Sequence, residues 1–157
     1  MKRYGPLHAV PDGLAIGDPG RRHLVLGVDT ISHRDGPAVT QQVDWTEIRG
    51  ATLDLRTTRF PFPGAFSGLW SSVLVMITQT DPDLDLAPGT AVLTTDHGSL
   101  RLDLDRHHPG GYWHPIVSRT QLLMDRLVED AASRPLLRQS NAVLDSIVSS
   151  VRRARVA

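Results

Sequence analysis

The chain has 157 residues, which is enough for one domain with its own hydrophobic core. Its 17 Lys and Arg balance its 17 Asp and Glu, so its net charge gives no general attraction to nucleic acid or to an anionic membrane. It has no cysteine, which excludes disulfides, thiolate zinc sites and cysteine nucleophiles. No stretch approaches the roughly 20 apolar residues of a membrane helix, and the start lacks the apolar core of a secretory signal. We therefore expect a cytoplasmic protein.

Short apolar segments dominate the first two thirds of the chain. Residues 1–22 are rich in Gly and Pro, and we expect an irregular lead-in that adds at most an edge strand. Seven segments of strand length then follow, at residues 24–28, 30–34, 39–43, 51–57, 73–78, 91–95 and 100–104. Alternation of apolar and polar residues and intervening turn signals predict consecutive antiparallel hairpins with one solvated face.

The stretch between the fourth and sixth segments is the hardest to interpret. Residues 59–68 contain Pro and Gly that exclude regular structure, and Phe60, Phe62 and Phe66 are interleaved with them. Residues 69–78 are a continuous apolar run that fits a buried strand or a short helix. The three aromatic side chains either fold back onto the core or form an exposed patch, which normally marks an interface. We name them as candidate binding residues, with peripheral membrane contact as a weaker alternative.

The hydrophobic period changes to about 3.6 residues after His114, which predicts an amphipathic helix over residues 115–131. A second helix is expected over residues 135–153. Its apolar residues recur every seven positions, a spacing typical of helices that pack against a facing helix. The facing helix is either the first one or a second subunit, and we favour a homodimer because two-fold dimers are the commonest assemblies. The candidate contact residues are Leu137, Leu144, Ile147 and Val151.

This order of elements predicts an α+β fold, mainly β: a seven-stranded antiparallel bent barrel or sandwich capped by a C-terminal helix, plus a second C-terminal helix. The pattern resembles the pleckstrin-homology-like family. The local match is the sequence VDWTEIR, in which Trp45 and Ile48 form a Trp-x-x-Ile step that bacterial members often have between two strands. The resemblance covers about residues 23–131. It leaves residues 1–22 as the lead-in and residues 132–157 as an additional helix, packed on the same domain or on a partner.

The resemblance implies a binding module. Its lipid-binding members hold phosphoinositides over a basic loop between the first two strands. In this chain the corresponding loop consists of Gly27, Val28, Asp29 and Thr30. The loop is short and acidic, so phosphoinositide binding is not expected.

One cluster has the composition of a metal site. His107, His108 and His114 follow Asp103 and Asp105 in the sequence, and imidazole and carboxylate groups are ligands of zinc and similar metals. The spacing matches no standard site, however, and a solvated loop between strand and helix is the plainer interpretation.

We expect no catalytic residue, no cofactor and no nucleic-acid partner, because nucleophile-elbow, phosphate-loop and basic-aromatic motifs are all missing from the sequence. The chain is therefore interpreted as a non-catalytic interaction module that acts through protein–protein contacts. The alternative is a small metal- or ligand-binding barrel enzyme that uses the Asp103, Asp105, His107, His108 and His114 cluster.

Overall fold

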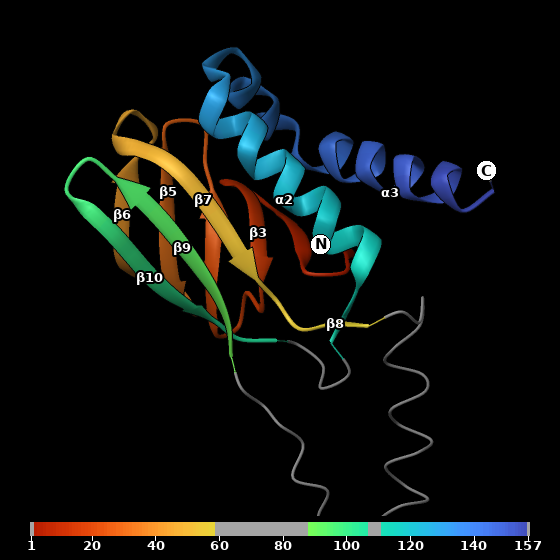
Figure 1. Cartoon of the computed structure of the whole chain (residues 1–157), viewed down its shortest axis with the longest axis horizontal. Coiled ribbons are helices and arrows are strands. Elements are labelled where there is room, and N and C mark those ends of the chain that lie inside the picture. The colour runs from red at the N-terminus through yellow and green to blue at the C-terminus, as the bar shows by residue number, and fades with distance from the viewer. Residues whose placement is uncertain (1, 59–87, 107–110, 157) are drawn as a thin grey trace, which may run out of the picture.

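A computed structural model of the chain describes residues 2–58, 88–106 and 111–156. Two sheets lie against each other, and two C-terminal helices pack beside them (Figure 1). The prediction of a mainly β fold of the α+β class with two C-terminal helices is confirmed. The closed seven-stranded barrel is not confirmed, because both sheets are open.

The larger sheet is an antiparallel meander of six strands in chain order. Residues 1–22, expected to be irregular, contribute the first three of them. Their Pro and Gly residues lie mainly in the turns between strands of two to five residues. The strands are β1 (Arg3–Tyr4), β2 (Leu7–Val10), β3 (Gly13–Gly17), β4 (Arg22–Leu26), β5 (Thr30–Asp35) and β6 (Ala38–Asp44).

The smaller sheet has three antiparallel strands in the order β10, β9, β7. The β9–β10 hairpin turns at Asp96 and His97, where the sequence predicted it, and Gly98 follows with a φ of 131°. The bounds are β7 (Ile48–Asp54), β9 (Gly89–Thr95) and β10 (Gly98–Leu104); the short strands β8 (Thr57–Thr58) and β11 (Tyr112–Trp113) form a parallel pair. The predicted segment 73–78 lies outside the described residues.

The helical part comprises α2 (His114–Glu129), the 3-10 helix η2 (Ala131–Gln139) and α3 (Ser140–Val156). Pro115 lies in the first turn of α2, as the sequence predicted. Asp130 begins η2 by accepting hydrogen bonds from the backbone N–H of Ala132 (3.0 Å) and the hydroxyl of Ser133 (2.5 Å). The second α-helix therefore begins at Ser140, five residues later than expected.

Trp45 connects the sheets to the helices. It lies in the 3-10 turn η1 (Trp45–Glu47), is only 2% exposed, and its indole Nε1 donates to the carbonyl of Gly27 at 2.8 Å. The guanidinium of Arg134 lies 5.3 Å from the centre of the indole. The same guanidinium donates to the carbonyls of Leu127 and Val128, which are among the last acceptors of α2. Trp45 is therefore a packing residue at the junction of the sheets and the helices.

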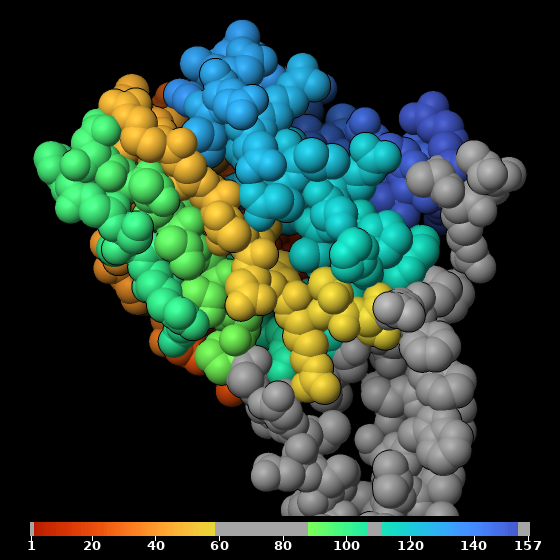
Figure 2. Space-filling model, in the orientation of Figure 1, coloured from red at the N-terminus to blue at the C-terminus, as the bar shows by residue number. Residues whose placement is uncertain are grey.

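Helix α2 lies along β7, as Figure 2 also shows. Gln121 forms the polar part of this contact. Its Oε1 accepts from the backbone N–H of Leu53 at 2.8 Å, and its Nε2 donates to the carbonyl of Ala51 at 2.7 Å and to Asp125 at 2.7 Å. The side-chain amide thus bonds to the edge of β7 as the peptide group of a neighbouring strand would.

Helix α3 packs on β1 and β2. Lys2 forms an ion pair with Asp145 at 2.6 Å, and the hydroxyl of Ser140 donates to the carbonyl of Val10 at 3.3 Å. The core enclosed by the sheets and helices includes Leu14, Ile16, Leu24, Leu26, Leu93, Leu104, Met124, Leu127, Leu144 and Val151.

Candidate functional site

The aspartates of the predicted metal cluster are paired with an arginine. Arg22 donates to Asp103 at 2.9 Å and to Asp105 at 2.9 and 3.1 Å. Its hydrogen bonds lower the pKa of the Asp105 carboxyl. Both carboxylates therefore have a cationic partner already.

The histidines of that cluster give little further support. His114 is the exposed first residue of α2, where its Nδ1 lies 3.5 Å from the hydroxyl of Ser118. His107 and His108 lie outside the described residues. Within residues 2–58, 88–106 and 111–156, no three His, Asp or Glu side chains are grouped so that they could hold a metal ion.

The candidate binding residues of the second helix face the interior of this chain. Leu137, Leu144 and Val151 are each 1% exposed, and Ile147 is also buried. The seven-residue stripe is therefore the inner face of η2 and α3. Phe60, Phe62 and Phe66 lie outside the described residues.

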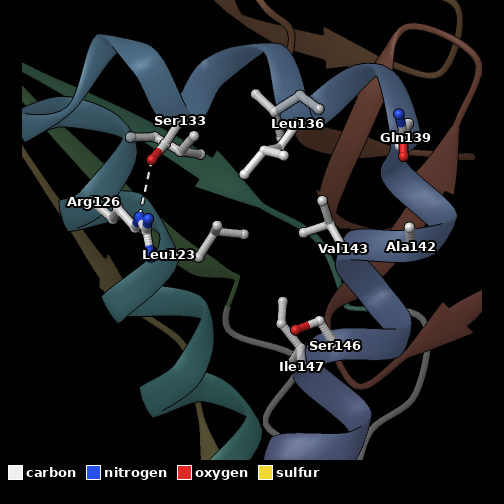
Figure 3. Close-up of a pocket in the computed structure, with 11 residues that line it drawn as sticks. Leu123, Arg126, Ser133, Leu136, Gln139, Ala142, Val143, Ser146 and Ile147 are labelled. Atoms are coloured by element: carbon white, nitrogen blue, oxygen red, sulfur yellow. Dashed lines mark hydrogen bonds between the residues drawn. The ribbon is translucent and has the colours of Figure 1, made fainter.

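An apolar surface, lined in part by Leu137 and Ile147 of this stripe, opens to solvent between the two helices. This surface, called the helix groove below, lies between α2, η2 and α3 and encloses about 310 Å³ (Figure 3). That volume is at the lower end of the range for ligand cavities. Aliphatic side chains line most of it, and Leu136 at its mouth is 55% exposed. The lining residues are Leu123, Arg126, Leu127, Ser133, Leu136, Leu137, Gln139, Ala142, Val143, Ser146 and Ile147.

The helical periods explain how the walls of the helix groove form. A 3-10 helix has three residues per turn, so Ser133, Leu136 and Gln139 lie on one side of η2 and all line the groove. On α3, Val143 and Ile147 are four residues apart and share a face of the helix. Leu136 was not predicted as a contact residue, because an α-helical period from Pro135 onward does not place it on the stripe of Leu137, Leu144 and Val151. The available signal was the three-residue spacing of 133, 136 and 139 after a capping aspartate.

Arg126 is the one charged residue among the described residues that line the helix groove. Its Nε donates to the hydroxyl of Ser133 at 2.9 Å, and Figure 3 shows this bond across the end of the groove. The Ser133 hydroxyl in turn donates to Asp130, which lowers the pKa of that carboxyl. The bond to Ser133 holds the guanidinium at the groove mouth.

Two other concave surfaces in the described part of the chain are more polar. A cleft of about 430 Å³ lies between β4, β5, β6 and β10, and contains the Arg22–Asp103 pair. His33 crosses it, donating from Nε2 to the carbonyl of Asp103 at 2.8 Å. The other surface, of about 370 Å³, contains the Arg34–Asp12 pair. Several charged groups of these surfaces already pair with one another, so the helix groove is the stronger candidate site.

A comparison of the chain with protein-family models, curated proteins and solved structures found no match. In the described part of the chain, no helix has the length and apolar character needed to cross a membrane.

Proposed function

We propose that this chain is a cytoplasmic, non-catalytic interaction module of pleckstrin-homology-like fold that binds a partner protein in the helix groove. The observation that carries the proposal is the exposed Leu136 at the mouth of a groove lined mainly by aliphatic side chains. A buried aliphatic side chain contributes about 1.5–3 kcal/mol, so two or three partner side chains placed here would supply the centre of an interface.

The walls of the groove favour a helical partner. Backbone groups within helices bond mainly to their own helix, so α2 and α3 offer no edge to pair with a strand. An extended peptide placed here would bury backbone N–H and C=O groups without partners, which is costly. A helix satisfies its own backbone and presents apolar side chains on one face, the arrangement known from helix-in-groove recognition.

Two features support the family part of the proposal, and two others argue against its alternatives. Antiparallel hairpins precede a helix that packs on the smaller sheet, and the Trp45–Ile48 step lies between β6 and β7. The connection from β4 to β5 is short and carries Asp29, which argues against an anionic lipid headgroup there. Pairing of Asp103 and Asp105 with Arg22 likewise argues against the metal-dependent enzyme.

The test uses methyl NMR of the full chain with a model amphipathic helical peptide of about 16 residues, or four turns, that has Leu on one face and Gln on the other. We expect shifts in the methyl groups of Leu123, Leu136 and Val143, and loss of binding in Leu136→Ser. Val39→Ser is the matched control, because Val39 lies on β6, away from the groove, and is 52% exposed. Equal weakening by both variants, or shifts spread over the sheets, would refute the proposal.

A further inference from the structure

We infer that the partner helix carries acidic residues along the edge that meets α2, an inference that depends on the proposed function of the helix groove. Arg126 is the only charge among the described lining residues, and it stands at the groove mouth. Arg119, seven residues earlier on α2, is exposed on nearly the same side of the helix. A helix lying along α2 would therefore meet two cations about two turns apart.

Two acidic residues near these cations already accept hydrogen bonds, and Glu129 is exposed on α2 but does not line the groove. Asp130 accepts hydrogen bonds from Ser133 and Ala132, and Asp125 accepts from the side-chain amide of Gln121. On α3, Asp145 pairs with Lys2, on the side that faces β1. None of these carboxylates lines the groove, so its mouth has a positive character that an acidic edge would complement.

The same cations argue against a second copy of the chain as the occupant. In a two-fold dimer the same patch meets itself, so Arg119 and Arg126 of one copy would approach those of the other. Like charges brought together across an interface oppose association. An acidic helix from a different protein meets no such repulsion.

The test compares three peptides with the same Leu face and with Gln, Glu or Lys at the edge positions that meet α2. Each exposed ion pair should make the Glu peptide bind about two- to five-fold more tightly than the Gln peptide. The Lys peptide should bind more weakly than both. High salt should reduce the differences among the three affinities because exposed charges are screened.

A charge exchange separates a direct pairing from a structural effect of the arginine. In Arg126→Glu the preference for the Glu peptide should be lost, because the attraction to Arg119 is then offset by the new carboxylate. In the double variant Arg119→Glu/Arg126→Glu the preference should reverse, so that the Lys peptide binds more tightly than the Glu peptide. In Arg126→Gln the difference should shrink. Arg21→Glu is the control, because it changes the net charge equally from an exposed turn of the larger sheet and should leave the wild-type ranking intact.

The outcomes distinguish the two proposals. If the Gln peptide binds in a Leu136-dependent way but the Glu and Lys peptides bind equally, the acidic edge is wrong and the docking function stands. If none of the three peptides binds, the docking function itself fails. Self-association that Leu136→Ser abolishes, measured by sedimentation, would assign the groove to a second copy and overturn the inference.

Discussion

Replacing Leu144 with alanine tests whether α3 belongs to this domain. Leu144 is 1% exposed within the main core. The substitution removes about three buried carbons, each of which contributes about 0.8 kcal/mol, so the transfer term alone is about 2.4 kcal/mol. The cavity left behind brings the expected loss in the free energy of unfolding to about 2–5 kcal/mol. For a chain of this length, that corresponds to a decrease in Tm of roughly 4–20 °C.

Urea unfolding followed by circular dichroism, at low and high protein concentration, measures the loss. Leu122→Ala is the control, because the same chemical change at a 56% exposed position on α2 should cost under about 0.5 kcal/mol. A loss below about 1 kcal/mol for Leu144→Ala would refute the packing argument. A loss that depends on protein concentration would show that α3 completes its core against another molecule.

Three further changes test other parts of the structure. Gln121→Leu should speed hydrogen exchange of the Leu53 amide and lower the free energy of unfolding by about 1–3 kcal/mol, because that N–H loses its acceptor; unchanged exchange would contradict this. Hydrogen bonds from Arg22 lower the pKa of Asp105 in the folded state. They therefore stabilise the fold above about pH 4, and this stabilisation is lost as the pH falls through the lowered pKa. Arg22→Gln should therefore raise the Asp105 pKa in an NMR titration, and its stability difference from wild type should shrink in acid. Burial lowers the pKa of His23 in the folded state. As the pH falls, the unfolded chain therefore binds a proton at His23 before the folded chain does, and the free energy of unfolding should decrease below about pH 6.5. His23→Asn should reduce that slope in urea titrations, and an unchanged slope would refute the assignment.

The hairpins were predictable because their signals are local. The turns between β5 and β6 and between β9 and β10 carry Gly at positive φ, and such turns fix the register of the strands that they connect. The turn between β1 and β2 also carries Gly at positive φ (Gly5, 58°), so the first strands were missed for another reason. Every residue of β3 is buried, so the alternation that identifies a half-solvated strand is missing there.

Other features depend on contacts between distant residues. The pairing of Gln121 with Ala51 and Leu53 spans about 70 positions, and no local pattern specifies it. The stripe containing Leu137 and Leu144 shows that one face is buried, but periodicity is the same whether that face meets its own sheet or another subunit. The helix groove was not predicted, because it depends on η2 being a 3-10 helix and residues 135–139 were expected to begin an α-helix.

The packing of α3 on β1 and β2 has a consequence for biosynthesis. A ribosome makes these two strands before the other described strands and α3 after all of them, so part of the larger sheet stays uncovered while the rest of the domain is synthesised. Leu7, fully buried in the finished fold, belongs to this early segment. Nascent chains halted before Ser140 should therefore depend on chaperones more strongly than chains in which α3 has emerged.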